Sequence, residues 1–392
     1  MKITLTQDQQ NVLEKFKRGE NLLVLGDSGT GKSTVIFHIV ETAKATGRKV
    51  AVTATTGIAA QLIGGRTIHK LLKYYPGMNY NNVFYEEKVG FIEDFDVIIV
   101  DEISMMGRCF TDYFYNCLMH VDHPIQLIFS GDFFQLPPVR DTYAFTSPFW
   151  NSFRLKPCAL HQVIRQQDKE FVHNINLLKY GDKRCLEYLL SHSNPYPLNG
   201  QISICATRQD AESINRAALE SLGGAPHAYL ADYEGEVSDS DISAEKCLIL
   251  KPGTRVMSLI NGRHYSNGSL GTVIDLDTTS VKVLFDDGYE WLFTPYPFTA
   301  ERTDKLGETT TFMQIPLRAA SAITIHKSQG QTFDMVNIDG RRCWAPGQLY
   351  VAVSRAKSIE GIHFLTPIRP ENIKTDPAVI SFINNLSNGD IN

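Results

Sequence analysis

Short apolar runs alternate with longer amphipathic stretches over the first 165 residues, and this alternation predicts the secondary structure. Four runs are typical of buried strands because they are short and rich in Val, Ile and Leu. They cover residues 21–25, 49–53, 96–100 and 127–130. The stretch after Gly26 favours a helix to about Thr46. We therefore expect a parallel α/β sheet covered on both faces, with functional groups on loops at the carboxyl ends of its strands.

A second α/β pattern begins near residue 166, with a strand-like run at 202–207 and helical spacing over 209–222. Residues 225–241 are acidic and are expected to be rich in loops. The pattern resumes in three short apolar runs at 322–325, 335–338 and 362–365.

Residues 253–316 have a different character, which indicates a β-rich insertion. Two β-prone runs, Val281–Phe285 and Tyr289–Phe293, flank Asp286-Asp287-Gly288 and predict a hairpin. With the runs at 255–259 and 271–274, they predict a small barrel inserted in the second domain.

Residues 64–91 interrupt the first pattern with aromatic side chains, among them Tyr74, Tyr75 and Phe84. We interpret this segment as an insertion in the first domain. A satellite hydrophobic cluster is an equally good interpretation.

Composition excludes several classes of protein. The 392 residues are 43% apolar and 21% charged, which is ordinary for globular domains and excludes disorder, collagen and coiled coil as the main architecture. No apolar run approaches the ~18 residues of a membrane span. The net charge of −5 gives no overall attraction to nucleic acid but permits a local basic groove. The seven cysteines form no C-x-x-C pair, so we expect reduced thiols in a cytoplasmic or nucleoid protein.

The segment from Gly26 to Ser33 fits the phosphate-binding pattern G-x-x-x-x-G-K-[ST] and lies between a predicted strand and a predicted helix. This segment is called the P-loop. Glycines let backbone N–H groups surround phosphate oxygens, and the helix N-terminus adds positive potential. Lys32 is expected to reach the β- and γ-phosphates, and the Ser33 hydroxyl to ligate Mg²⁺. The nucleotide-binding candidates here are Gly26, Ser28, Gly29, Thr30, Gly31, Lys32, Ser33 and Thr34.

Asp101 and Glu102 end the predicted strand at 96–100 and complete this chemistry. An acid at the end of a buried strand can hold Mg²⁺ opposite the P-loop serine, so Asp101 is the second metal candidate. The neighbouring carboxylate of Glu102 can orient and deprotonate the attacking water. Together the two segments predict hydrolysis of a nucleoside triphosphate, but they do not say what the hydrolysis drives.

Further motifs resemble those of superfamily 1 DNA helicases, most closely the Pif-type helicases of the 5′→3′ branch, relatives of RecD and the phage Dda helicase. Gln9 resembles the adenine-reading glutamine of these enzymes, and Val163 to Gly181 resembles a stretch typical of the Pif branch. The remaining motifs follow in the family's order at residues 55–60, 67–69, 101–105, 131–138, 325–331 and 348–355. The resemblance covers about Leu5 to Thr366, so we expect a bare motor core without accessory domains.

The resemblance implies roles for residues outside the P-loop. It implies that Gln135 senses the γ-phosphate, that Arg165 and Arg355 act as arginine fingers from the second domain, and that Gly330 contacts the nucleotide. Arginine suits the finger role because its fixed fork of donors can spread over phosphoryl oxygens. The residues in motifs that line the family's single-strand groove are Thr55, His69, Pro137 and His326. Thr55 stands where the family usually has proline. Local hydrogen bonding explains each such Thr or His equally well when it is taken singly.

The family carries a strand-separating wedge where residues 64–91 fall, so Tyr74, Tyr75 and Phe84 are candidates to stack on a base at the fork. It carries an SH3-like β-barrel insertion where residues 253–316 fall. The predicted fold is therefore α/β, with two RecA-like P-loop domains. The first spans 1–165, and the second spans 166–252 and 317–392.

The resemblance implies a monomeric, ATP- and Mg²⁺-dependent motor that binds ATP between these domains. Its partners would be single-stranded and forked duplex DNA, in a bacterium or phage-infected cell. Three alternatives stay open: a small-molecule kinase, a DNA-stimulated translocase or clamp-loader-like switch without unwinding, and an RNA helicase.

Overall fold

The computed structural model describes residues 5–74, 90–237, 242, 244–301 and 309–388. The chain forms two compact units. The first contains residues 1–195, 326–334 and 340–392, and the second contains residues 196–325 and 335–339. The predicted RecA-like domains are defined by their nucleotide-binding folds rather than by compactness, so their boundaries stay a prediction.

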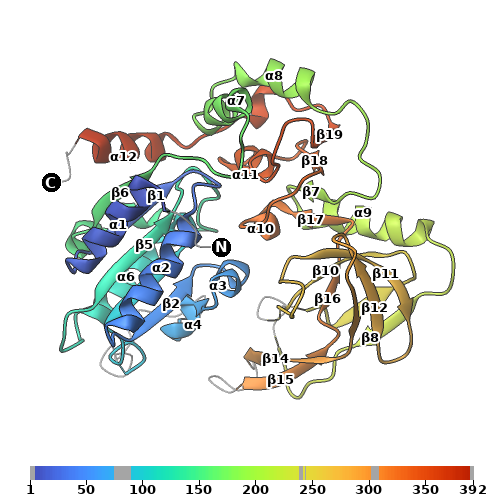
Figure 1. Cartoon of the computed structure of the whole chain (residues 1–392), viewed down its shortest axis with the longest axis horizontal. Coiled ribbons are helices and arrows are strands. Elements are labelled where there is room, and N and C mark those ends of the chain that lie inside the picture. The colour runs from blue at the N-terminus through green and yellow to red at the C-terminus, as the bar shows by residue number, and fades with distance from the viewer. Residues whose placement is uncertain (1–4, 75–89, 238–241, 243, 302–308, 389–392) are drawn as a thin grey trace. The chain divides into compact units, whose positions relative to one another are not determined.

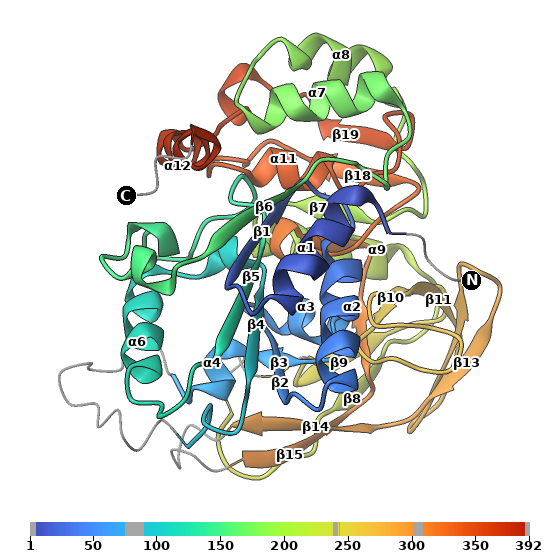
Figure 2. The same ribbon diagram turned by 60° about the vertical axis from the view of Figure 1, so that its left-hand side comes forward.

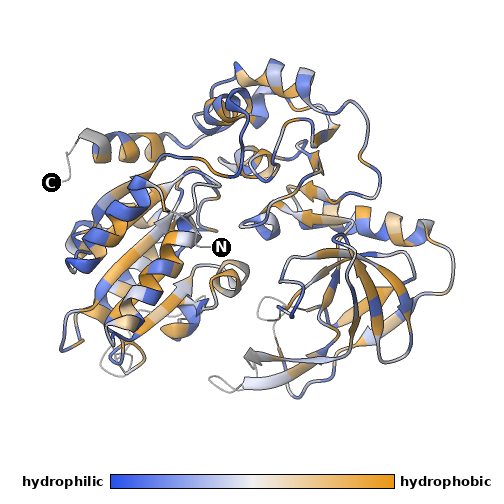
Figure 3. Ribbon diagram, viewed as in Figure 1, coloured by the Kyte–Doolittle hydropathy of each residue, from blue (hydrophilic) through white to orange (hydrophobic). Residues whose placement is uncertain are grey.

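The first unit is built on a six-stranded parallel sheet of order β3-β2-β4-β5-β1-β6 (Figure 1). Its strands are β1 (Leu22–Gly26), β2 (Val50–Ala54), β3 (Arg66–Thr67), β4 (Val97–Asp101), β5 (Gln126–Gly131) and β6 (Lys156–Leu160). The central strands β4 and β5 are buried along their whole length. Figure 3 shows these central strands as largely hydrophobic. This burial on both sides explains why they are continuous apolar runs in the sequence.

Helices cover both faces of this sheet (Figure 2). On one face, α1 (Gln7–Lys17) and α2 (Lys32–Ala45) contribute Phe16 and Ile39 to a core shared with β1, β4, β5 and β6. On the other face, Phe114 of α6 (Arg108–Leu118) packs against Phe129 of β5, with ring centroids 6.3 Å apart. The prediction of a covered parallel α/β sheet is therefore confirmed.

The rest of the first unit is mainly helical. Its other helices and its last strand are α3 (Gly57–Leu62), α4 (Ile68–Leu71), α7 (Lys169–Lys179), α8 (Cys185–His192), α11 (Gln348–Val353), β19 (Ile362–Thr366) and α12 (Pro377–Asn388). Helix α10 (Ile325–Ser328) begins where the second unit ends. Asp168 caps α7 by accepting hydrogen bonds from the backbone N–H groups of Glu170 and Phe171.

The second unit combines a parallel sheet with antiparallel ones. Strands β17 (Ala322–Thr324), β7 (Ser203–Cys205) and β18 (Val336–Asp339) are parallel neighbours, and α9 (Arg208–Ser221) packs on them through Ala211. A five-stranded antiparallel sheet has the order β13-β12-β11-β10-β16. Its strands are β10 (Arg255–Ser258), β11 (Leu270–Leu276), β12 (Val281–Phe285), β13 (Glu290–Phe293) and β16 (Leu317–Ala319).

The predicted hairpin at residues 281–293 is confirmed, since β12 and β13 pair antiparallel around the Asp-Asp-Gly turn. Two further antiparallel pairs join β8 (His227–Leu230) to β9 (Cys247–Leu250) and β14 (Tyr296–Glu301) to β15 (Thr309–Gln314). Within the segment 225–241, which was expected to be rich in loops, residues His227–Leu230 form a short strand by pairing with β9. The SH3-like classification of the insertion stays a prediction.

Within the part of the chain that the structure describes, helices are too short or too polar to cross a membrane.

Candidate nucleotide-binding site

The P-loop connects strand β1 to the 14-residue helix α2, as the sequence pattern predicts. Gly29 and Gly31 have φ values of 86° and 82°, in the left-handed region that favours glycine. Space is also limiting, because a Cβ atom on Gly29 would lie 2.5 Å from Cβ of Arg165. A Cβ atom on Gly31 would lie 2.6 Å from Nε2 of Gln9. These two glycines therefore let the loop curl tightly beside its neighbours.

The ammonium group of Lys32 folds back onto its own loop. Its Nζ donates hydrogen bonds to the backbone carbonyls of Gly26, at 2.7 Å, and Asp27, at 3.0 Å. The Asp27 carbonyl also accepts from the hydroxyl of Thr30, at 2.9 Å. The structure thus keeps a positive charge at the P-loop, next to the backbone N–H groups at the start of α2.

Gln9 lies beside the P-loop and is 1% exposed. Its side-chain oxygen accepts from the backbone N–H of Thr6 in a capping box, and its Nε2 donates to the Thr30 carbonyl at 3.2 Å. The amide therefore fixes the start of α1 against the P-loop. The base-reading role implied for it stays a prediction.

Asp101 and Glu102 form an acidic wall where β4 ends. Both are less than 10% exposed, and Glu102 has a φ of 53°, which is strained for a residue with a side chain. Burial raises the pKa of Asp101. Burial, together with the Asp101 charge, raises the pKa of Glu102 to about 7. A carboxyl group that titrates near neutrality is matched to general-base catalysis.

Two buried oxygens at this wall have no hydrogen-bond partner among the described residues: Oε2 of Glu102 and Oε1 of Gln135. The amide nitrogen of Gln135 lies 3.5 Å from Oδ2 of Asp132. Buried polar groups are almost always paired, with protein, water or ligand. The unpaired oxygens therefore fit a site that binds a polar ligand.

Two arginines meet the P-loop at one atom. Nη1 of Arg165 and Nη2 of Arg355 each donate to the hydroxyl oxygen of Ser28, both at 2.6 Å. Arg165 also donates to the Ser354 carbonyl at 3.1 Å, and Nε of Arg355 donates to the Val351 carbonyl at 3.1 Å. Burial lowers the pKa of Arg355, and burial together with the Arg355 charge lowers that of Arg165 to about 9.

These groups line one pocket of the first unit, with a volume of about 560 Å³. The lining residues are Ser28, Gly29, Gly31, Lys32, Ser33, Thr34, Asp101, Glu102, Gln135, Ile164, Arg165, Gly330, Thr332, Arg355 and Lys357. The sequence-predicted catalytic residues all belong to this set. Three predicted nucleotide-binding residues are outside this lining: Gly26 and Thr30, which belong to the P-loop, and Gln9, which bonds to the Thr30 carbonyl. Ile164, Thr332 and Lys357 are additional, and each lies within two residues of a predicted one.

Ser33 and Asp101, the predicted Mg²⁺ ligands, both line this pocket. A hydroxyl and a carboxylate are hard oxygen ligands of the kind that Mg²⁺ takes alongside substrate phosphates. The described residues contain no cluster of three or more His, Cys, Asp or Glu side chains that could hold a metal alone. The hydroxyl of Ser33 and the carboxylate of Asp101 fit a Mg²⁺ ion whose other ligands are phosphate oxygens and water.

Four residues that the sequence did not single out connect this pocket to its surroundings. Lys179, at the end of α7, forms an ion pair with Asp27 of the P-loop. The Tyr350 hydroxyl, on α11, donates to Oδ2 of Asp132 at 2.8 Å. Tyr350 and Asp132 lie inside recognisable motifs, which is a usable signal. Lys179 lies within the stretch from Val163 to Gly181 that resembles the Pif branch, but it is not among the residues that carry that resemblance.

The predicted nucleic-acid residues lie in different places. The hydroxyl of Thr55, after β2, donates to the Glu102 carbonyl at 2.8 Å. His69 and Tyr74 are in contact, with ring centroids 5.6 Å apart, and both pack on Phe110 of α6. Burial lowers the pKa of His69 to about 4.

Pro137 and His326 are half-buried, Pro137 after β5 and His326 in α10. Tyr75 and Phe84 lie outside the described residues. The roles of all these residues in DNA binding stay predictions.

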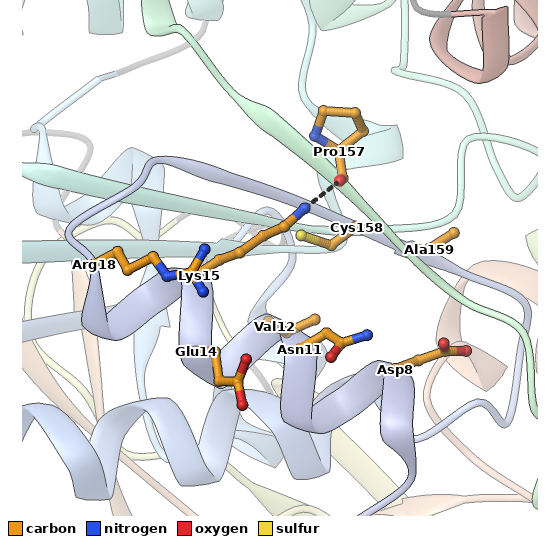
Figure 4. A pocket seen from close by; sticks show the side chains of 9 residues that line it. All are labelled: Asp8, Asn11, Val12, Glu14, Lys15, Arg18, Pro157, Cys158 and Ala159. Carbon is orange, nitrogen blue, oxygen red and sulfur yellow. Dashed lines mark hydrogen bonds between the residues drawn. The ribbon is translucent and has the colours of Figure 1, made fainter.

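A second pocket, of about 330 Å³, lies between α1 and the edge strand β6 (Figure 4). Lys15 points across it and donates to the Pro157 carbonyl at 3.3 Å. Its lining shares no residue with the P-loop pocket, and it carries none of the predicted chemistry.

Comparison with known proteins gives consistent matches over the chain. Residues 4–194 match the family described as AAA domain, and residues 319–358 match the family described as UvrD-like helicase C-terminal domain. ATP-dependent DNA helicase PIF1 of Rattus norvegicus is 30% identical over 98% of this chain, which spans 64% of that protein. ATP-dependent DNA helicase Pif1 of Bdellovibrio bacteriovorus is 29% identical over 97% of this chain and 92% of its own length. A crystal structure of Bacteroides Pif1 helicase in complex with ADP-AlF3 and ssDNA superposes with a TM-score of 0.77, at 29% identity, over 98% of both chains.

Proposed function

This chain belongs to the Pif1 helicase family, and we propose that it is an ATP-dependent DNA helicase that moves 5′→3′ on single-stranded DNA and unwinds the duplex ahead. The observation that carries the proposal is the convergence of Lys32, Glu102, Arg165 and Arg355 on one pocket. A phosphate-binding loop explains only the first of these. The full set supplies what phosphoryl transfer to water needs: groups that bind the phosphates, a general base, and cations that stabilise the charge on the transferred phosphoryl group.

Each group has a role that follows from its position. Lys32 and the N–H groups at the start of α2 bind the phosphates, which are anions at a helix N-terminus. Glu102 orients the attacking water and takes its proton, since burial has brought its pKa to about 7. Arg165 and Arg355 stabilise charge that develops on the γ-phosphate, a contribution of ~10³–10⁵ in rate for such fingers. Gln135 senses the γ-phosphate by contacting it when ATP is bound.

Ser33 and Asp101 would hold Mg²⁺, which supplies charge neutralisation on the β- and γ-phosphate oxygens when bound. The hydroxyl of Ser33 sits at the start of α2 and the carboxylate of Asp101 at the end of β4. Helix α2 and strand β4 hold the Ser33 hydroxyl and the Asp101 carboxylate in fixed positions.

Hydrolysis drives movement through the difference between two sets of contacts. ATP favours the conformation in which both arginines meet the γ-phosphate, and loss of that phosphate removes the contact. A ligand shifts a conformational equilibrium only through such differential contacts. DNA held mainly by its phosphates and stacked bases would advance by one step, with little dependence on sequence.

The test compares ATP hydrolysis with and without single-stranded DNA, and strand release on forked substrates with a 5′ or a 3′ tail. We expect stimulation by DNA, unwinding only of the 5′-tailed fork, and loss of both activities in Lys32→Ala. Hydrolysis that DNA does not stimulate would favour a kinase. Stimulated hydrolysis without strand release would favour a translocase, and preferential binding of RNA in a competition titration would favour an RNA helicase.

A further inference from the structure

Ser28 provides one oxygen atom to two cations. Its hydroxyl accepts a hydrogen bond from Arg165 and another from Arg355, each at 2.6 Å, and the residue is 7% exposed. A hydroxyl oxygen has two lone pairs, so these two bonds use its whole accepting capacity. Ser28 belongs to the P-loop, whereas the arginines come from the segment after β6 and from the end of α11.

Two backbone carbonyls and one hydroxyl hold the arginines from the other side. Arg165 keeps a bond to the Ser354 carbonyl, and Arg355 keeps bonds to the Val351 carbonyl and, at 3.2 Å, to the Ser354 hydroxyl. None of these acceptors belongs to the P-loop. Ser28 is therefore the P-loop group that draws both guanidinium ions to the mouth of the phosphate site.

A neutral oxygen between two like charges is a weaker partner than an anion would be. Two guanidinium ions close together repel each other, and the uncharged Ser28 hydroxyl offers no negative charge to offset that repulsion. A phosphate oxyanion adds direct charge attraction to the same hydrogen bonds. An arriving phosphate oxyanion would satisfy the same donors and neutralise that repulsion. The guanidinium groups can exchange acceptors at the P-loop while their backbone bonds at Ser354 and Val351 stay in place.

We propose that Ser28 is a positioning residue, which holds Arg165 and Arg355 at the P-loop before nucleotide binds and releases them to the γ-phosphate of ATP. This inference rests on the proposed function, since it takes both arginines as γ-phosphate contacts. If so, the γ-phosphate of ATP and the hydroxyl of Ser28 compete for the same two guanidinium groups. ATP must replace the two bonds to Ser28, whereas ADP leaves them intact.

The test uses Ser28→Ala in the full chain and measures dissociation constants for ADP and for a non-hydrolysable ATP analogue. Removing the hydroxyl destabilises only the nucleotide-free and ADP-bound states, because only in these states does Ser28 bond to the arginines. We therefore expect the analogue to bind about tenfold or more tightly relative to ADP than it does in the wild type, the effect of losing bonds to charged donors. The nucleotide-free variant should also melt at a lower temperature, and the analogue should restore more of that loss than ADP restores.

Ser147→Ala is the matched control, because Ser147 is a buried serine of the same unit whose hydroxyl donates to Asp112 at 2.5 Å. It should lower the melting temperature and leave the ratio of the two dissociation constants unchanged. Ser28→Thr keeps a hydroxyl and should restore the wild-type ratio. An unchanged ratio in Ser28→Ala, or a change that favours ADP, would overturn the inference. Failure of the wild type to bind either nucleotide would instead refute the proposed function.

Discussion

Replacing Lys179 with Met tests whether a buried ion pair holds the P-loop in place. The Lys179 ammonium pairs with Asp27 and lies 4.5 Å from the centre of the Phe134 ring. Its side chain is 11% exposed and that of Asp27 is 25% exposed. Burial lowers the pKa of Lys179, but the carboxylates of Asp132 and Asp27 outweigh burial and raise it above its usual value. The lysine is therefore charged at neutral pH.

The magnitude follows from what the substitution leaves behind. Methionine keeps an unbranched stem against Phe134, so the change is mainly the loss of one charge. Removing one partner of a buried pair costs about 3–5 kcal/mol, and the residual hydration of Asp27 places this pair near 3 kcal/mol. That loss corresponds to a fall of about 6–10 °C in the melting temperature, measured by calorimetry on the nucleotide-free protein.

Nucleotide binding should weaken in the same variant. The Asp27 carbonyl accepts hydrogen bonds from Lys32 and Thr30, so a displaced Asp27 loosens the phosphate cradle. The control is Asp27→Asn in the Lys179→Met background, which removes the orphaned carboxylate and should recover at least half of the lost stability. A melting temperature that stays within 1–2 °C of the wild type, well below the ~6 °C fall expected, would refute the reasoning. So would a double variant less stable than the single one.

Three further substitutions probe separate parts of the same unit. Glu102→Gln should keep ATP binding but slow single-turnover hydrolysis by about 10²–10⁴, as expected for loss of a general base, and loss of binding would contradict that role. Burial lowers the pKa of His69 to about 4 in the folded state, against 6.5 in the unfolded chain. Stability is therefore full above pH 6.5, where His69 is neutral in both states. It falls as pH drops toward 4, because only the unfolded state takes up the proton. Between pH 7 and pH 5 the wild type should lose about 2 kcal/mol more than His69→Phe in urea unfolding, and parallel pH profiles would argue against it. Tyr350→Phe removes the bond to Asp132 and should lower the free energy of unfolding by about 2 kcal/mol; a change below ~0.5 kcal/mol would show that water replaces it.

Local patterns in the sequence predicted the elements that carry the phosphate chemistry. The run at 21–25 became β1 over Leu22–Gly26, and the helix expected to end near Thr46 ends at Ala45. These predictions succeed because a buried strand, a glycine-rich turn and a helix start are each encoded within a few neighbouring residues.

Elements that depend on distant partners were not predicted. Strand β6 contains Pro157 and has little β-branched character, and it forms by pairing with β1, more than 130 residues earlier, as the outer strand of the sheet. Proline is tolerated there because an edge strand leaves one row of N–H positions unpaired. Strand β8 likewise forms in an acidic segment through its pairing with β9.

In the candidate site too, features encoded by local motifs were predicted and contacts between distant residues were not. Motif order was enough to name most of the residues that line the pocket, but not Ile164, Thr332 and Lys357. It could not show that Arg165 and Arg355 share the Ser28 hydroxyl, or that Lys179 pairs with Asp27. Those contacts join residues more than 130 positions apart, and no local pattern records them.

Helix α11 links two parts of the nucleotide pocket, because Tyr350 on this helix bonds to Asp132 and both arginines bond to the backbone at its C-terminal end. Tyr350 is bonded to Asp132, which also lies within hydrogen-bonding reach of Gln135. Directly after the end of the same helix at Val353 come Ser354, whose carbonyl accepts from Arg165, and Arg355, which donates back to the Val351 carbonyl of the helix. An arginine that moves toward the γ-phosphate therefore pulls on the helix that positions Asp132. We expect Gln135 and the two arginines to respond to ATP together, because a six-residue helix is too short to bend between its two ends.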